Sequence, residues 1–298
     1  MDQRLLGRTG LKVSVLGFGG SEIGSENITA AQADRLLNGA VDIGLNLIDT
    51  AECYGASEEL IGAAVSHRRQ DYCLLTKCGH ASDLGLPEWT PSLIEKSIER
   101  SLRRLRTDYI DIVQLHSCGE ETLRRGEVIA ALQRARDRGQ ARYIGYSGDS
   151  RAALYAVECG AFDTLQISVS IADQEAIDMV LPAAIERRIG VIAKRPIANA
   201  AWIRRWPFFW PYSRVYRRRL RKLDYDFLRR KAHDAVAVAL RFVLSVPGVH
   251  TAIVGTGKLS RCQGNAALAA KGPLPPTVYQ YIRERWRAVA EPDWTGRY

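Results

Sequence analysis

The chain lacks a long apolar run, a secretory leader and a closely spaced set of cysteines. No stretch of about 18 consecutive apolar residues occurs in its 298 residues, so the sequence predicts no transmembrane helix. The first ten residues, MDQRLLGRTG, lack the apolar region of a secretory signal, which favours a cytoplasmic protein. The six cysteines include no CxxC pair, so we expect reduced thiols, with neither a disulfide framework nor a metal site.

An even distribution of charge is also lacking. The chain has 42 Lys and Arg against 33 Asp and Glu, and residues 202–231 hold eleven of the former and two of the latter. The remainder of the chain is therefore neutral. Because the whole basic excess lies in one segment, we expect no nucleic-acid partner, although this segment could dock an acidic surface.

Eight short apolar runs alternate with longer amphipathic stretches. The runs are VSVLGF (13–18), LNLID (45–49), YCLLTK (72–77), YIDIVQLH (109–116), RYIGYS (142–147), DTLQISV (163–169), GVIAK (190–194) and HTAIVG (250–255). Thr90 and Pro91 show how a helix follows a run, since they provide an N-cap and a proline at the first helical position. The pattern predicts an α/β fold, a (β/α)8 TIM barrel in a single domain over residues 1–298. A doubly wound open sheet is the competing architecture. In the barrel, residues 202–231 form a basic insertion within the long loop after strand seven.

Ionisable residues stand at the ends of three consecutive predicted strands. Asp49 ends the second, Lys77 the third and His116 the fourth, and Tyr54 follows Asp49 in the next loop. Each residue alone has a structural explanation, as a helix cap, a packing residue or a solvated side chain. Together they predict a site, because active sites of such barrels lie at the C-terminal ends of the strands. A lysine beside a tyrosine lowers the pKa of the phenol, and a carboxylate fixes the lysine in place. The group suits proton transfer to a carbonyl oxygen and needs a hydride donor from elsewhere.

Several motifs extend this interpretation over nearly the whole chain. They are RLLGRTGLKVSVLGFGG (4–20), DTAECYGASEELIG (49–62), the strands of Lys77 and His116, and IVGTGKLSRCQGN (253–265). In these motifs the chain resembles the aldo-keto reductase family. The resemblance implies an N-terminal β-hairpin before the barrel. It also implies Asp49, Tyr54, Lys77 and His116 as a catalytic tetrad that reduces an aldehyde or ketone, with Tyr54 as the general acid and NADPH as the hydride source.

The resemblance also implies where the cofactor binds. Ser147 and Gln166 match the residues that hold the nicotinamide carboxamide, and Lys258 and Arg261 at a helix N-terminus favour the 2′-phosphate of NADPH. The full set of expected cofactor contacts is Gly20, Ser147, Gln166, Lys194, Arg195, Gly255, Thr256, Gly257, Lys258, Arg261 and Asn265.

The chain departs from the family pattern at three places. Gly148 stands where the family usually has Asn, and Gly264 where it often has Glu. Lys194-Arg195-Pro196 replaces a Tyr-Ser-Pro motif whose ring stacks on the nicotinamide. Either the Arg195 guanidinium or the Lys194 stem could cover that ring instead.

Three further questions stay open in the sequence. The basic segment is a lid over the cofactor phosphates, a docking patch, or an amphipathic helix with Val215, Leu220, Leu223 and Phe227 on its apolar face. Trp89 and Trp294 are expected to shape the substrate pocket. As a whole, the protein is either a reductase or a cofactor-binding redox-sensing or scaffold protein with little turnover.

Overall fold

The core of the molecule is a closed barrel of eight parallel strands. The computed structural model describes residues 1–25, 28–80, 83–203 and 211–296, and within them the barrel order is β10-β3-β4-β5-β6-β7-β8-β9. The strands are β3 (Leu16–Gly19), β4 (Leu47–Asp49), β5 (Cys73–Cys78), β6 (Ile110–His116), β7 (Ala141–Ser147), β8 (Thr164–Ser168), β9 (Gly190–Lys194) and β10 (Val249–Gly255). Each overlaps one of the predicted apolar runs. The TIM barrel is therefore confirmed, and the open sheet is wrong.

A two-stranded antiparallel hairpin precedes the barrel, as expected. It pairs β1 (Gln3–Leu5) with β2 (Lys12–Ser14), and η1 (Gly7–Thr9) lies in its turn. The predicted run 13–18 was wrong in its bounds, because it merged β2 with β3. The chain changes partner at Val15, whose N–H donates to the Asp2 carbonyl (2.9 Å) while its own carbonyl accepts from Ala252 (3.0 Å). The apolar pattern continues through this bend, so the sequence did not mark it.

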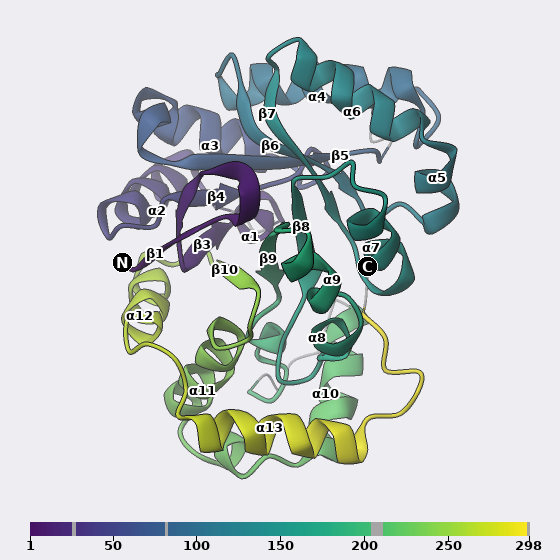
Figure 1. Cartoon of the computed structure of the whole chain (residues 1–298). Coiled ribbons are helices and arrows are strands. Elements are labelled where there is room, and N and C mark those ends of the chain that lie inside the picture. The colour runs from purple at the N-terminus through teal and green to yellow at the C-terminus, as the bar shows by residue number, and fades with distance from the viewer. Residues whose placement is uncertain (26–27, 81–82, 204–210, 297–298) are drawn as a thin grey trace.

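A ring of helices surrounds the strands (Figure 1). The helices are α1 (Ser21–Ser25), α2 (Ala30–Asp42), α3 (Ser57–Val65), α4 (Pro91–Leu105), α5 (Glu120–Arg125), α6 (Glu127–Asp137), α7 (Ser150–Glu158), α8 (Glu175–Met179), α9 (Leu181–Glu186), α10 (Pro211–Leu223), α11 (Ala232–Leu244), α12 (Leu259–Ala269) and α13 (Pro276–Val289). Short 3-10 turns are η2 (Ser66–Asp71), η3 (Ala198–Ala200) and η4 (Asp226–Arg229). Helix α4 begins as predicted: Thr90 Oγ1 accepts from the Leu93 N–H at 3.4 Å, and Pro91 takes the first position.

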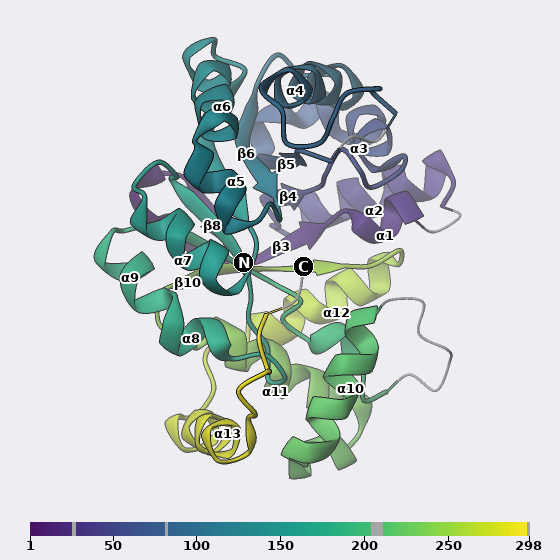
Figure 2. The ribbon, with the colours of Figure 1, turned by 90° about the vertical axis from the view of Figure 1, so that its right-hand side faces the viewer.

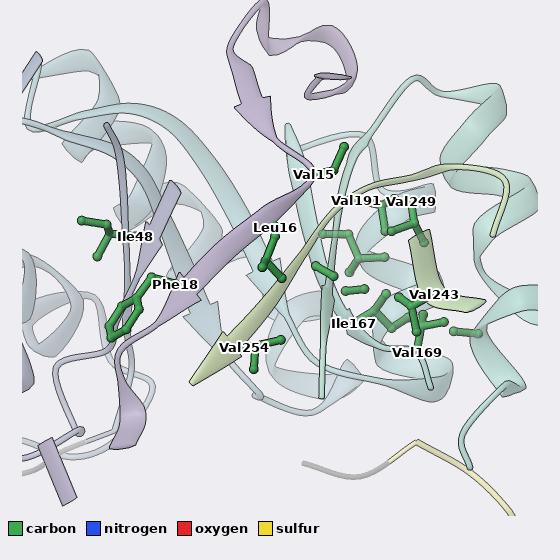
Figure 3. Close-up of a cluster of buried hydrophobic side chains, with 14 of the residues drawn as sticks. Val15, Leu16, Phe18, Ile48, Ile167, Val169, Val191, Val243, Val249 and Val254 are labelled. Atoms are coloured by element: carbon green, nitrogen blue, oxygen red, sulfur yellow. The ribbon is translucent and has the colours of Figure 1, made fainter. Parts of the chain in front are cut away.

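The side chains of each strand alternate between its two faces, and this alternation separates two apolar clusters. Residues on one face of the strands pack against the helices, and Figure 3 shows part of this outer layer, including Phe18, Ile48 and Ile167. The residues between them point into the barrel, because successive side chains of a strand face opposite sides. Those nearest the strand starts form a second cluster that the hairpin closes: Leu6, Val13, Leu47, Cys73, Leu75, Ile112, Ile192 and Ile253.

The long connection after β9 carries α10 and η4. Both views place α10 and α13 on the same side of the barrel (Figures 1 and 2), and the two helices contact each other. Leu220 and Leu223 are buried and Val215 is half-buried, so the predicted amphipathic helix is confirmed as far as Leu223. Phe227 is buried too, but it lies in η4, because the chain leaves the helix at Asp224, where φ is +43°. Arg204 and Arg205 of the basic segment lie outside the described residues. In the described ranges, no helix is both long and apolar enough to cross a membrane.

Candidate active site

The polar residues predicted for the site come from the inward-facing positions at the strand ends. The register aligns His116 with Ser147 and Ser147 with Gln166 on neighbouring strands, so these three side chains lie at one level. Lys77 and Asp49 also face inward, two residues after Leu75 and Leu47 of the apolar inner cluster. The same alternation that fills one end of the barrel with apolar side chains thus fills the other with polar ones.

Asp49 and Lys77 form a buried ion pair at the centre of this level. Lys77 Nζ lies 2.7 Å from Asp49 Oδ2 and donates a second hydrogen bond to the Thr50 carbonyl at 2.8 Å. The side chains of Lys77 and Asp49 are only 1% and 3% exposed. Asp49 Oδ1 accepts from Gln166 at 2.7 Å and from Gln114 at 3.5 Å. The carboxylate is therefore held from both sides, and it holds the lysine in turn.

Tyr54 and His116 complete the predicted tetrad. The Lys77 ammonium lies 4.9 Å from the centroid of the Tyr54 ring, and the edge of that ring meets His116 with centroids 5.6 Å apart. Both aromatic side chains are half-buried, so they border the open side of the site. The structure thus brings together all four residues that the sequence singled out.

Two glycines fix the loop that presents Tyr54. Gly55 has φ of +52°, which favours glycine, and a Cβ there would lie 2.5 Å from the Gly24 carbonyl oxygen. A Cβ on Gly24 would lie 1.7 Å from the carbonyl oxygen of Tyr54. Helix α1 and the tyrosine loop can approach this closely only because both positions are glycine.

The ionisation of the four groups follows from burial and from the ion pair. Burial raises the pKa of Tyr54, and this outweighs the opposing effect of the Lys77 ammonium. The predicted effect of Lys77, which lowers that pKa, is therefore present, but the net shift is upward because burial is the larger effect. Burial lowers the pKa of Lys77, but Asp49 and Tyr54 overcome it and the net shift is upward. Burial and the cation of Lys77 hold the pKa of His116 well below its usual value. At neutral pH, Tyr54 therefore carries its proton and His116 is uncharged.

The residues expected to hold the nicotinamide end lie next to the tetrad. Ser147 Oγ donates to Gln166 Oε1 at 3.2 Å, and both side chains are buried. Gly20 is buried behind Asp49, since its N–H donates to the Asp49 carbonyl at 2.7 Å. Gly148 has a packing reason: a Cβ there would lie 2.3 Å from the Tyr146 hydroxyl, which donates to the Cys118 carbonyl.

Lys194 and Arg195 differ in their surroundings. Lys194 Nζ lies 3.1 Å from Asp149 Oδ2 and is buried, and burial lowers its pKa to about 8 despite the carboxylate. Arg195 is half-buried, and its Nη1 donates to Ser168 Oγ at 3.0 Å. Both side chains are thus held by neighbours, the lysine by Asp149 and the guanidinium by Ser168, and Arg195 is the more exposed of the two.

The residues expected to hold the adenosine half lie at the start of α12. β10 pairs with β3 and β3 with β4, so this helix begins two strands from Asp49. Thr256 is buried and its Oγ1 accepts from the Lys258 N–H at 3.2 Å, while Gly255 and Gly257 are half-buried. Lys258 and Arg261 are exposed, and within the described ranges neither forms a salt bridge. Asn265 is half-buried one turn further on.

Several residues at the site were missed by the sequence analysis. Gln114 braces Asp49, and its position two residues before His116 on an inward face was a usable signal. Cys53 lies with its Sγ 3.3 Å from His116 Nδ1, and His80 lies between His116 and Trp89 with ring centroids 5.2 and 5.1 Å away. Nothing in the sequence pattern distinguished these two, because each depends on how a loop folds back.

The two tryptophans expected in the pocket lie in different surroundings. Trp89 is half-buried beside His80, near the tetrad, although residues 81–82 of its loop lie outside the described residues. Trp294 is 2% exposed and packs on Trp286, with the Arg219 guanidinium over its ring. Trp294 therefore anchors the C-terminal tail instead of shaping the pocket, and that expectation was wrong.

A TIM barrel whose C-terminal rim gathers a buried lysine–aspartate pair, a tyrosine and a histidine has the architecture of a barrel oxidoreductase. A model of the Aldo/keto reductase family matches residues 15–287, and the chain belongs to that family. It is 29% identical over 282 residues to L-galactose dehydrogenase of Arabidopsis thaliana, covering 90% of this chain and 88% of the relative.

Solved structures agree with this assignment. An aldo-keto reductase from Bacillus halodurans, in its holo form, superposes with a TM-score of 0.82 at 26% identity, covering 99% of both chains. An aldo-keto reductase from Klebsiella pneumoniae, solved in complex with NADPH, has the same fold with a TM-score of 0.75 at 23% identity, covering 98% of this chain and 97% of that one.

Proposed function

We propose that this protein reduces an aldehyde or ketone to an alcohol with NADPH, and that Tyr54 is the general acid. The observation that carries the proposal is the buried Asp49–Lys77 pair beneath Tyr54 and beside His116, at the rim where barrel enzymes place their chemistry. The hydride for the carbonyl carbon is what a nicotinamide cofactor supplies when it is bound.

The tetrad residues take distinct roles in this reaction. His116 is neutral and binds the carbonyl oxygen through a ring N–H, which orients the substrate. Tyr54, kept protonated by burial, donates its phenolic proton to the same oxygen as the alcohol forms. The Lys77 ammonium then stabilises the resulting phenolate, and Asp49 keeps the ammonium in place.

The residues present fit a nicotinamide dinucleotide phosphate. Ser147 and Gln166 place a hydroxyl and an amide side by side at the level of the tetrad, which suits a carboxamide. Lys258 and Arg261 add two exposed cations to the N-terminus of α12, where backbone N–H groups favour an anion. The 2′-phosphate, which NADPH carries and NADH lacks, gives these cations a partner.

A Tyr54→Phe substitution tests the assignment of the acid. We expect kcat for carbonyl reduction to fall about 10²- to 10⁴-fold, since only the proton donor is lost, while NADPH affinity stays unchanged. Tyr281→Phe, on the outer helix α13 and 40% exposed, is the matched control. Turnover that survives in Tyr54→Phe sinks the assignment. A wild-type protein that binds NADPH but reduces no carbonyl would favour the scaffold alternative.

Cofactor preference tests the phosphate site on α12. In a fluorescence titration, Lys258→Met with Arg261→Met should weaken NADPH binding by about 10- to 100-fold and leave NADH binding unchanged, because charge-assisted hydrogen bonds to one phosphate are lost. Lys271→Met, just beyond the other end of the helix, is the control. Equal loss of NADH affinity would show that the two cations do not recognise the 2′-phosphate.

The same titration addresses the nicotinamide ring. We propose that the Arg195 guanidinium covers the ring where the family often has an aromatic side chain, because Arg195 is half-buried whereas Lys194 is buried against Asp149. Arg195→Ala should weaken NADPH and NADH alike, in contrast to the α12 variants. If NADPH and NADH affinities are unchanged in Arg195→Ala, the guanidinium does not cover the ring. The relative named L-galactose dehydrogenase makes L-galactose a first compound to assay in the oxidative direction.

A further inference from the structure

The thiol of Cys53 lies against the histidine of the tetrad. Cys53 precedes Tyr54 in the loop after β4, and its Sγ is 3.3 Å from His116 Nδ1. That separation is within hydrogen-bonding range for sulfur, and one of the two atoms must supply the proton. If the thiol supplies this proton, the ring proton of neutral His116 is on Nε2; if His116 supplies it, the ring proton is on Nδ1.

No other described group competes for this nitrogen. His116 meets Tyr54 and His80 only through ring edges, with centroids 5.6 and 5.2 Å away. In the part of the chain that the structure describes, Nε2 has no hydrogen-bond partner. A neutral imidazole therefore has one nitrogen facing a thiol and the other directed at no protein group, which leaves it for a ligand.

The chemistry of the two groups selects one arrangement. A neutral imidazole has one N–H and one strongly accepting lone pair, whereas a thiol is a weak acceptor. If Nδ1 carried the proton, the accepting lone pair at Nε2 would face the lone pairs of a substrate carbonyl and repel them. Cys53 is exposed as a residue, yet desolvation in this loop raises the pKa of its thiol to about 11, so the thiol keeps a proton that it can donate.

We propose that Cys53 is a positioning residue: its S–H donates to Nδ1 of His116 and so keeps the ring proton on Nε2, the nitrogen that binds the substrate carbonyl. This inference rests on the proposed function, because it assigns His116 to the carbonyl oxygen. The tyrosine loop thus presents the acid and also sets the tautomer of the neighbouring histidine.

The tautomer is measured directly by ¹⁵N NMR on protein labelled at histidine, with the His116 signals assigned from a His116→Gln variant. In the wild type we expect a protonated-type shift at Nε2 and an unprotonated-type shift at Nδ1. In Cys53→Ala the two shifts should move toward each other as both tautomers become populated. Cys53→Ser, which keeps a donor, should stay nearer the wild type, and Cys159→Ala, an exposed cysteine on the outer surface, should change nothing.

Kinetics supplies a second readout. Cys53→Ala should lower kcat by about three- to tenfold, as expected for one neutral hydrogen bond, with KM changed less than twofold and kcat largely recovered in Cys53→Ser. The inference would be overturned if the His116 ¹⁵N shifts in Cys53→Ala equalled those of the wild type. It would also be overturned if the wild-type protein carried the His116 ring proton on Nδ1. A wild type that lacks carbonyl reduction but shows the expected shifts would instead contradict the proposed function and leave the Cys53–His116 arrangement standing.

Discussion

Asp49 is the residue on which the site depends most. Its two oxygens accept from Lys77 on one side and from Gln166 on the other, and the carboxylate is almost fully buried. A buried ion pair contributes little net stability, because the desolvation of both charges offsets their attraction. Removing one partner is costly, since it leaves the other charge buried and unpaired.

This asymmetry gives a prediction for the ion pair. Lys77→Met should lower the free energy of unfolding by about 3–5 kcal/mol and abolish turnover. Adding Asp49→Asn should restore most of that stability, because no charge then remains buried, but it should restore no turnover, since the ammonium beside Tyr54 is still missing. Chemical denaturation and steady-state kinetics measure the two effects.

An exposed ion pair serves as the control. Arg229 Nη2 lies 2.7 Å from Asp224 Oδ1, but the two side chains are 65% and 57% exposed. Arg229→Met should therefore change the unfolding free energy by less than about 1 kcal/mol. If Lys77→Met lowers the free energy of unfolding no more than Arg229→Met does, the Asp49 carboxylate must become protonated or hydrated when its partner is removed.

Single residues also show what the sequence could predict. Asp49, Lys77 and His116 were found because each ends an apolar run, and strand ends of a parallel barrel meet on one rim. The sign of the Tyr54 pKa shift was not predictable in this way. A sequence names the charged neighbours of a group, whereas the opposing effect of burial depends on the packed structure.

Helix α10 shows how an element with a basic sequence can be held by a few buried contacts. Its apolar face packs toward the barrel, and Arg219, though charged, is fully buried. Arg219 donates to the carbonyls of Ala172 and Thr295 at 3.2 and 2.7 Å, and its Nη1 lies 3.6 Å from Asp173 Oδ1. On the outer side, Arg218 and Lys222 pair with Asp293 and Glu291 of the tail. Three of the basic residues described in this segment therefore help to fix the tail, and docking of an acidic surface stays a prediction.

The carboxyl group of Asp173 makes the docking of α10 sensitive to pH. Burial raises its pKa from 3.8 to about 8, even though Arg219 acts in the opposite direction. Between these values the folded state holds a proton that the unfolded state has released. The contribution of Asp173 to the free energy of unfolding therefore decreases as the pH rises from about 4 to about 8.

Asp173→Asn removes this titration. Comparing denaturant midpoints at pH 5 and pH 8, we expect the variant to lose less stability over that interval than the wild type does. Asp224→Asn, at an exposed and paired carboxylate, should behave like the wild type. An unchanged difference between the two pH values in Asp173→Asn would show that Asp173 titrates normally in the folded protein.

At the scale of whole elements, the sequence predicted where the strands lie better than how neighbouring segments connect and pack. The apolar runs located all eight barrel strands, because each is buried on both faces and reads as a short continuous run. The boundary between hairpin and barrel was missed because Val13, Val15 and Leu16 are all buried while the chain changes partner between them. The tail was misjudged because Trp294, besides packing on the nearby Trp286 of α13, lies under Arg219 of α10, which is far from it in the sequence.

The molecule as a whole divides its interior between two ends of the barrel. At the end where the strands begin, the hairpin residues Leu6 and Val13 close an apolar cluster. At the other end, the same inward positions carry the tetrad and the expected nicotinamide contacts. In such barrels the first end serves stability and the second serves chemistry. The expected single domain implies that both ends unfold together.

This division predicts that stability and activity can be changed separately. Leu6 is fully buried, and the backbone of β9 lies close to it, since a Cβ on Gly190 would lie 2.7 Å from Leu6 Cγ. The surroundings of Leu6 are therefore packed too tightly to move into the space that a smaller side chain would leave. Leu6→Ala should lower the free energy of unfolding by about 2–5 kcal/mol through lost burial and the cavity that remains. Its kcat and KM at a temperature where it stays folded should equal those of the wild type.

Leu5→Ala, at a neighbouring side chain that is 56% exposed, should change the unfolding free energy by less than about 0.5 kcal/mol. If Leu6→Ala impairs kcat while the protein remains folded, the two ends are coupled through the inner side chains, and the inner apolar cluster must count as part of the support of the site.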